Sequence, residues 1–166
     1  MGGHADGPGI AFRRSRDRRR RHYAGRGLGS WHQIEGRKPQ RISVSNTRNV
    51  RGAVVETVNP ATWAEELLVR LHREVLLIPN TKSGVASDAS DAMVIAGLPM
   101  GYEDVATMPL LLTEAGGRVT DLLGHDVLQG NGTVLASNGY LHDALLELVG
   151  TVRHGRDYQA LLDARA

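Results

Sequence analysis

Segments that resemble strands alternate with segments that resemble helices along most of this chain, and this alternation limits the folds that the chain can adopt. Short segments typical of buried strands lie at 41–45, 52–57, 75–78, 92–96, 118–121 and 133–136. Segments with apolar residues at helical spacing lie at 62–74, 104–115 and 140–149. Strands that alternate with helices in this way predict an α/β domain with a mixed sheet and flanking helices.

Local signals suggest where these elements begin and end. Thr62 followed by Glu65 fits a capping box, which predicts that the first helix begins there. Gly116-Gly117 is a usual signal for a helix end. Pro109 falls inside the predicted second helix, so it either kinks that helix or marks its true start. Residues 80–90 are small and polar and predict a loop with one helical turn.

Charge is distributed unevenly between the start of the chain and the rest. Residues 1–22 hold seven arginines against Asp6 and Asp17, a sum of +5, so the remainder carries −3 of the total +2. Glycine and arginine without periodicity predict that residues 1–22 form a disordered, solvated arm. A basic arm also suits nucleic acid or a membrane surface. We favour the plain arm and expect no nucleic-acid partner, because no aromatic residue is interleaved with these arginines and no DNA-binding fold follows.

Size and composition narrow the remaining possibilities. The chain has 166 residues, of which 41% are hydrophobic, which suits one core and one domain. We therefore expect a domain over 23–150, followed by a C-terminal helix or tail over 151–166. The absence of cysteine excludes disulfides, zinc–thiolate sites and cysteine nucleophiles. No apolar run approaches the roughly 18 residues of a membrane span, and no secretory pattern opens the chain, so the cytoplasm is the expected compartment and no membrane partner is expected.

Five short motifs follow one another in the second half of the chain. They are Glu103-Asp-Val-Ala106, Glu114-Ala-Gly-Gly117, Arg118-Val-Thr-Asp121 with Gly124 after it, Val134-Leu-Ala-Ser-Asn-Gly139 and Leu141-His-Asp-Ala-Leu145. Their order and spacing resemble the C-terminal signature of the inositol monophosphatase family of magnesium-dependent sugar phosphatases, roughly W-D-x-A, E-A-G-G, T-D, G and A-S/T-N-G. The glycine-rich stretch 23–31 resembles the hairpin of that family, so the resemblance covers about 23–149.

The resemblance implies the C-terminal half of a layered α/β sandwich and a magnesium-dependent phosphomonoesterase. Its substrate would be a small sugar or alcohol phosphate of the inositol phosphate or histidinol phosphate type. Asp104 matches the metal-binding aspartate of the W-D motif, so the resemblance makes it a magnesium ligand; the alternative is a helix N-cap. Glu103 stands where the family has tryptophan, and it either adds a metal-binding oxygen or is a solvated charge.

Ser83 and Gly84 resemble the family's G-S/T-A-A turn, whose backbone approaches the substrate, although about two helical turns that follow in the family are missing. The resemblance implies a substrate-binding role for both, with a plain loop as the alternative. We expect Asp91 to open a strand rather than bind metal. We expect four other polar residues to lie on the solvated surface: His125, Asp126, His142 and Asp143.

The two main metal-binding motifs of the family, a glutamate pair before the hairpin and D-P-x-D-G-T, do not occur in this sequence. Glu65-Glu66 is the only adjacent pair, and we expect it on a helix surface. No catalytic residue is therefore assigned, and whether the chain is an enzyme stays open. It is either a truncated phosphatase or a non-catalytic remnant or interaction module of the same fold. The expected partners are a small phosphorylated alcohol and either a second copy or a missing N-terminal half.

Overall fold

Two β-sheets and the helices between and beside them make up the computed structural model, which describes residues 11–14, 20–24, 31–34, 40–80, 84–87, 89–157 and 163. Sheet A is antiparallel, in the order β1-β2-β3-β4. Its strands are β1 (Ala11–Arg14), β2 (Arg20–Ala24), β3 (Trp31–Ile34) and β4 (Gln40–Arg41).

Sheet B is mixed, in the order β6-β5-β7-β9-β8. Its strands are β5 (Val54–Val58), β6 (Leu76–Pro79), β7 (Ala92–Ile95), β8 (Arg118–Thr120) and β9 (Val134–Ser137). Strand β5 runs parallel to both β6 and β7, whereas β9 is antiparallel to β7 and β8.

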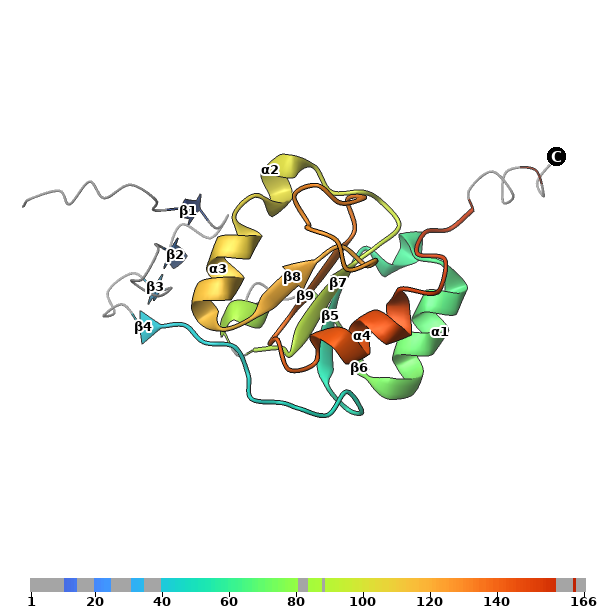
Figure 1. Cartoon of the computed structure of the whole chain (residues 1–166), viewed down its shortest axis with the longest axis horizontal. Helices are drawn as coiled ribbons and strands as arrows, with labels where there is room; N and C mark the ends of the chain where they lie inside the picture. Colours follow the sequence, from blue (N-terminus) through green and yellow to red (C-terminus); the bar gives the residue numbers. More distant parts are fainter. Residues whose placement is uncertain are drawn as a thin grey trace, which may run out of the picture.

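Helices separate and cover the sheets. They are α1 (Glu65–Glu74), α2 (Tyr102–Val105), α3 (Met108–Ala115) and α4 (His142–Val149), with single 3₁₀ turns η1 (Pro60–Thr62) and η2 (Val85–Ser87). Figure 1 shows the layers: sheet A at one end, then α3, then sheet B, and then α1 and α4 on the far face of sheet B. None of the helices that the structure describes is long and apolar enough to cross a membrane.

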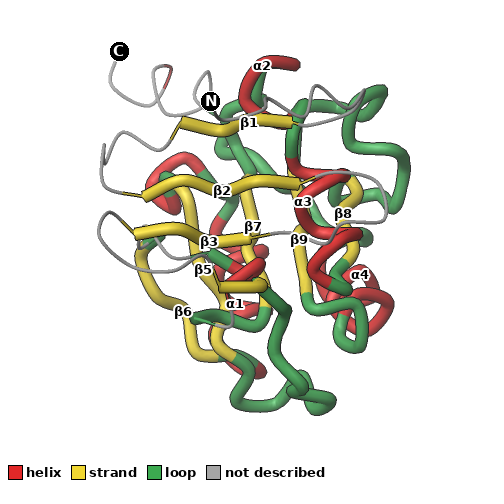
Figure 2. The backbone as a smooth tube through the Cα atoms, turned by 90° about the vertical axis from the view of Figure 1, so that its left-hand side faces the viewer, coloured by secondary structure: helices red, strands yellow, loops and turns green. Residues whose placement is uncertain are grey.

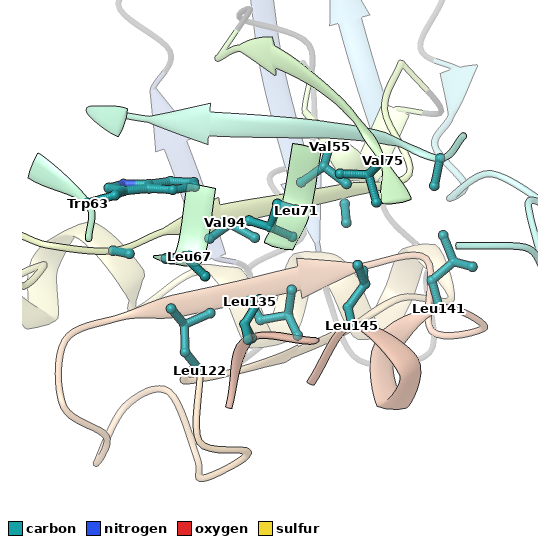
Figure 3. Packing of buried hydrophobic residues seen from close by; sticks show 14 of the residues in the cluster. Val55, Trp63, Leu67, Leu71, Val75, Val94, Leu122, Leu135, Leu141 and Leu145 are labelled. Carbon is teal, nitrogen blue, oxygen red and sulfur yellow. The ribbon is translucent and has the colours of Figure 1, made fainter. Parts of the chain in front are cut away.

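The main core lies between sheet B and the helix pair α1 and α4. Figure 3 shows Val55 and Val94 of the sheet close to Leu67 and Leu71 of α1. A second apolar cluster on the opposite face of sheet B joins α3 and η2 to the strands. The predicted α/β class with a mixed sheet and flanking helices is therefore confirmed.

The predicted capping box at Thr62 is wrong. The chain stays extended through the buried Trp63, which pairs with Gly155 near the C-terminus, and α1 begins only at Glu65. The Thr62 hydroxyl instead donates to the carbonyls of Asn59 and Ala96, so it fixes the turn before the helix.

The helix predicted over 104–115 is two helices. Pro109 lies in the first turn of α3, where its missing N–H breaks no bond, so it marks a true start rather than a kink. Gly116 ends α3 with a left-handed φ of 89°, as the glycine pair predicted.

Described parts of both ends of the chain pair with other segments. Within 1–22, residues 11–14 and 20–22 belong to β1 and β2, and the boundary expected at residue 22 falls inside β2. Residues 153–156 return along 62–64, where Ala64 N donates to the His154 carbonyl at 2.9 Å. From residue 158 on, the C-terminal helix or tail expected over 151–166 lies outside the described residues, apart from a helical Asp163.

Candidate functional site

Asp104, the predicted magnesium ligand, is exposed in the short helix α2. Its Oδ2 accepts a hydrogen bond from the backbone N–H of Gly101, the N-cap residue, at 3.3 Å. The carboxylate therefore caps the helix from its third position, rather than as the N-cap residue that the alternative interpretation described.

The surroundings of Asp104 do not supply a complete metal site. Glu103 is exposed beside it, but in the part of the chain that the structure describes, no three His, Cys, Asp or Glu residues are grouped closely enough to hold a metal ion. Magnesium takes several oxygen ligands in near-octahedral geometry. One carboxylate, with at most its neighbour, does not fit that requirement.

Gly84 lies in the connection that leaves the carboxyl end of β6, whereas its predicted companion Ser83 lies outside the described residues. Gly84 has a left-handed φ of 62°, and a Cβ built on it would meet nothing within 4 Å. The conformation, rather than crowding, is what favours glycine here.

This connection leaves the sheet at a topological switch point. After β5 the chain passes to α1 on one face of sheet B, and after β6 it passes to η2, which packs in the second cluster on the other face. In open α/β sheets, ligands bind outside the carboxyl ends of strands at such a point. Gly84 is therefore on the side of sheet B where a ligand is expected.

A buried carboxylate lies below the same point and was missed in the sequence. Glu56 of β5 is fully buried, and its Oε2 accepts a hydrogen bond at 3.0 Å from the side-chain amide of Asn80, the residue after β6. The available signal was a glutamate inside the valine-rich strand Val54–Val58.

Asp91 is the centre of a buried network that joins four segments. Its carboxylate accepts hydrogen bonds from Ser45 Oγ at 2.6 Å and from the Val54 amide at 2.7 Å. Asn138 Nδ2 donates to Ser45 Oγ at 3.0 Å and to the Thr47 carbonyl at 2.7 Å. Burial raises the pKa of Asp91, but hydrogen bonds from Ser45, Thr47 and Val54 outweigh it and hold that pKa below its usual value.

Asp121 organises the turn after β8 in a similar way. Its Oδ1 accepts from the amides of Leu123 and His125 at 2.9 and 2.8 Å, and its Oδ2 lies 3.2 Å from His125 Nδ1. Burial raises the pKa of Asp121. These hydrogen bonds, together with one from the Asn131 amide, outweigh burial, so the pKa of Asp121 lies below its usual value. Both buried aspartates are thus structural carboxylates.

The expectation that His142 lies on the solvated surface is wrong. Its ring is fully buried, with Nε2 at 3.0 Å from Thr120 Oγ1 and Nδ1 at 2.9 Å from Ser137 Oγ. Burial, with the nearby positive charge of Arg118, lowers the pKa of His142 to about 4, and the carboxylate of Asp143 opposes that shift. Asp143, Asp126 and His125 are exposed, as expected.

The contact between Ser137 and His142 is not a nucleophile–base pair. Both residues are fully buried under the start of α4, so a substrate does not reach the hydroxyl. The structure thus places Asp91, Asp121 and His142 in buried hydrogen-bond networks that stabilise the fold. It does not bring Asp104 together with further carboxylates among the described residues.

Comparison with known proteins gives relatives of which the chain spans only a part. No family model matches the chain. It is 29% identical over 140 residues to histidinol-phosphatase of Mycobacterium tuberculosis (strain ATCC 25618 / H37Rv), which covers 76% of this chain and 51% of that protein. It is also 48% identical over 50 residues to an uncharacterized 22 kDa protein in the trpE 5′ region of Leptospira biflexa, covering 30% of this chain and 26% of that protein.

Solved structures share the fold. Inositol monophosphatase from Anabaena (Nostoc) sp. PCC 7120 matches with a TM-score of 0.62 and 23% identity over 80% of this chain and 57% of that one. A calcium-bound IMPase family protein from Staphylococcus aureus matches with a TM-score of 0.71 and 16% identity, over 90% and 57% of the two chains. These likenesses confirm the predicted fold and the predicted resemblance to the inositol monophosphatase family, and the chain spans about half of the histidinol-phosphatase it resembles.

Proposed function

We propose that this chain is the C-terminal half of an inositol-monophosphatase-type phosphatase unit. The complete unit would hydrolyse a small sugar or alcohol phosphate, of the histidinol phosphate or inositol phosphate type, with magnesium. The observation that carries this proposal is the similarity to histidinol-phosphatase along three quarters of the chain, on a fold shared with inositol monophosphatases. A cytoplasmic location belongs to the same proposal.

The residues of this half have limited roles in that reaction. Asp104 would contribute one oxygen ligand to magnesium from the exposed start of α2. The backbone at Ser83 and Gly84 would approach the substrate from the connection after β6, at the switch point of sheet B. Since the described carboxylates do not form a complete magnesium site, no catalytic step is assigned to this chain alone.

The incomplete metal site also favours a second possibility, a non-catalytic remnant or interaction module of the same fold. The two proposals differ in what the chain does when it meets the rest of such a unit. A half of a phosphatase becomes active when the missing ligands are supplied, whereas a remnant does not. A second copy is the other partner that we consider.

Phosphate release from histidinol phosphate and inositol phosphate, in excess magnesium, tests the chain alone. We expect negligible turnover, and no difference between the natural chain and Asp104→Asn. Asp126→Asn is a matched control, because Asp126 is also exposed and also accepts one backbone hydrogen bond, from Leu128 at 2.8 Å. Robust turnover that Asp104→Asn abolishes and Asp126→Asn spares would show a working site within this chain.

The same assay with an added N-terminal half separates the two proposals. The chain would be mixed with, or fused to, the N-terminal half of the Mycobacterium tuberculosis histidinol-phosphatase. Turnover that appears only in the mixture and is lost in Asp104→Asn supports the phosphatase half. A stable complex without turnover supports the interaction module.

A further inference from the structure

Apolar side chains are exposed on two connections that leave sheet B at the same edge. The connections follow β7 and β8, which run in the same direction because both are antiparallel to β9. Leu98 is 51% exposed after β7, Tyr102 is 66% exposed at the start of α2, and Leu128 is exposed between β8 and β9. Figures 1 and 2 show α2 at the top of both views, at one extreme of the molecule.

The two connections lie against each other. The amide of Met100 donates to the carbonyl of Gly132 at 2.8 Å, and a Cβ built on Gly132 would overlap Pro99. Val127, in the second connection, belongs to the same apolar cluster as Val105 of α2. Single exposed apolar side chains are normal, but several on neighbouring segments mark an interaction surface.

The same end of the molecule is acidic. Glu103 and Asp104 of α2 and Asp126 of the second connection are exposed. Neither 96–106 nor 122–133 contains a lysine or an arginine. We call the surface that these residues form the α2 surface; it consists of Leu98, Tyr102, Glu103, Asp104, Asp126 and Leu128.

We infer that the α2 surface docks a basic polypeptide segment of a partner protein. The carboxylates attract lysine and arginine side chains of such a segment, and apolar side chains between them cover Leu98 and Tyr102. The charge disfavours the other occupants. A second copy would set carboxylates against carboxylates, and nucleic acid or an anionic membrane would meet charge of its own sign.

Hydrogen bonds already fix the backbone of the α2 surface. Asp104 accepts from the amide of Gly101 at 3.3 Å, and Asp126 accepts from the amide of Leu128 at 2.8 Å. The bond from Met100 to the other connection adds to them. Docking therefore has to order side chains but little backbone, which lowers the entropic cost of binding.

This inference goes beyond phosphate hydrolysis and does not rest on it. Asp104, the candidate magnesium ligand, stays unchanged in every variant below. Binding is measured in the presence of a chelator, so that magnesium does not compete for the carboxylates. Failure of the docking experiment therefore leaves the proposed function untouched, and the reverse also holds.

The experiment measures fluorescence anisotropy of labelled synthetic peptides with the full chain. In the first peptide lysine alternates with leucine, in the second lysine alternates with serine, and in the third glutamate alternates with leucine. We expect the lysine–leucine peptide to bind about tenfold more tightly than the lysine–serine peptide, because its leucines cover apolar surface. The glutamate–leucine peptide should not bind.

Serine variants test the apolar part of the α2 surface. Leu98→Ser and Tyr102→Ser should each weaken binding of the lysine–leucine peptide about fivefold and leave binding of the lysine–serine peptide unchanged. Tyr140→Ser is the matched control for Tyr102→Ser. Tyr140 is 52% exposed but follows β9, which is antiparallel to β7, so it lies at the opposite edge of sheet B. Circular dichroism confirms that each variant is folded.

Glu103→Gln combined with Asp126→Asn tests the charge. Asp126→Asn keeps the oxygen that accepts from the Leu128 amide, so the turn is retained. We expect binding of both lysine peptides to weaken about threefold at low salt and to depend less on sodium chloride. Asp143→Asn is the charge control, because Asp143 is exposed near the start of α4, at the opposite edge of sheet B, and should change binding little.

Three outcomes would overturn the inference. If the lysine–leucine peptide binds no more tightly than the glutamate–leucine peptide, the surface does not select a basic partner. If Tyr140→Ser weakens binding as much as Tyr102→Ser, the peptide contacts the chain generally and not the α2 surface. If no peptide binds, and Leu98→Ser converts a dimer to a monomer in light scattering, the surface is an interface between copies.

Discussion

The hydrogen bonds around His142 fix its tautomer. Thr120 Oγ1 donates its single proton to the Asp121 carbonyl at 2.7 Å, so it accepts from Nε2–H of the ring. Nδ1 then carries the lone pair and accepts from Ser137 Oγ. The buried histidine is therefore neutral, and a second proton on Nδ1 would meet a hydroxyl that is already donating to it.

This environment predicts a loss of stability in mild acid. The pKa of His142 falls from 6.5 in the unfolded chain to about 4 in the fold, so the unfolded state binds the proton more readily. The contribution of His142 to the free energy of unfolding is complete above pH 6.5 and is lost between pH 6.5 and pH 4. The loss is roughly 3 kcal/mol at most. Asp91 and Asp121, whose pKa values are lowered, lose their contributions only below pH 3.8.

Urea unfolding at pH 7 and at pH 4.5 measures that loss. In His142→Asn, which keeps an acceptor near the position of Nδ1, the free energy of unfolding should be lower at pH 7 but should change much less between the two pH values. An equal pH dependence in both proteins would mean that His142 is not the group that titrates.

The network at Asp91 predicts a large cost for its removal. Asp91→Ala leaves the Ser45 hydroxyl and the Val54 amide without their acceptor in the interior, so we expect a loss of about 3 kcal/mol in the free energy of unfolding. Asp143→Ala removes an exposed ion pair with Arg118 and should cost less than about 1 kcal/mol. Thermal unfolding of both variants tests the contrast, and equal costs would contradict a structural role for the network.

Magnesium binding by Asp104 should be weak. A single exposed carboxylate does not displace the tightly held water of the ion, so we expect roughly millimolar or weaker affinity. Isothermal titration calorimetry with magnesium chloride should give the same weak signal for the natural chain and for Asp104→Asn. Micromolar binding that this substitution removes would reveal ligands beyond those described here.

The sequence analysis predicted the location of some of these polar residues correctly and that of others wrongly. Asp91 was correctly expected to open a strand rather than to bind metal. His142, in the helix predicted over 140–149, was expected at a solvated surface. The stripe buried in α4 is His142, Leu145 and Val149. A polar residue takes a core position there, which hydrophobic periodicity alone does not detect.

The segment before α1 lies very close to the loop after β7. Gly97, with a left-handed φ of 83°, lies so close to Thr62 that a Cβ would overlap its hydroxyl and its carbonyl group. Gly155 also packs closely on Gly97, so the two glycines let 62–64, 97 and 153–156 approach one another.

Gly97→Ala should therefore destabilise the fold through overlap as well as strain. We expect a loss of about 3 kcal/mol or more. Gly52→Ala is a matched control, because Gly52 has nearly the same φ, 82°, with nothing within 4 Å of a built Cβ. Its cost should be about 1 kcal/mol, from strain alone. Equal costs in urea unfolding would show that the close approach to Thr62 does not contribute.

The pairing of β1 with β2 makes a prediction for the protein in solution. The sequence analysis expected 1–22 to be disordered, because arginine-rich stretches lack a hydrophobic period. The structure pairs Ala11–Arg14 with Arg21–Ala24. Amide hydrogen exchange should show protection in these two stretches that exceeds the protection of a free chain. Exchange at unprotected rates across both would support the disordered arm.

Elements with a clear hydrophobic period, such as β5, β7, β9, α1 and α4, were predicted from the sequence to within a few residues. The start of α1 was not, because the tertiary pairing of Trp63 with Gly155 overrides the local capping signal at Thr62. The register of sheet A was not predicted, because the arginine-rich stretch that forms β1 and β2 lacks the clear hydrophobic pattern that specifies register.

As a whole molecule, the chain spans 51% of the histidinol-phosphatase and 57% of the Anabaena inositol monophosphatase to which it is similar. It closes its main core, but strand β6 stays at the edge of sheet B with no described strand on its outer side. Leu76 on that edge is 59% exposed. Pro79 removes one N–H from the edge, but the other backbone groups of a four-residue strand still invite pairing.

We therefore expect the natural chain to associate at micromolar concentration, as a dimer or larger species, through this edge. Leu76→Lys places a charge on the edge and should shift the chain toward the monomer. Leu98→Lys is the matched control, because Leu98 is 51% exposed but lies in the loop after β7, so it should leave association unchanged. Light scattering measures both. A compact natural monomer with cooperative unfolding would contradict the prediction, and an equal effect of the two lysines would place the contact elsewhere than β6.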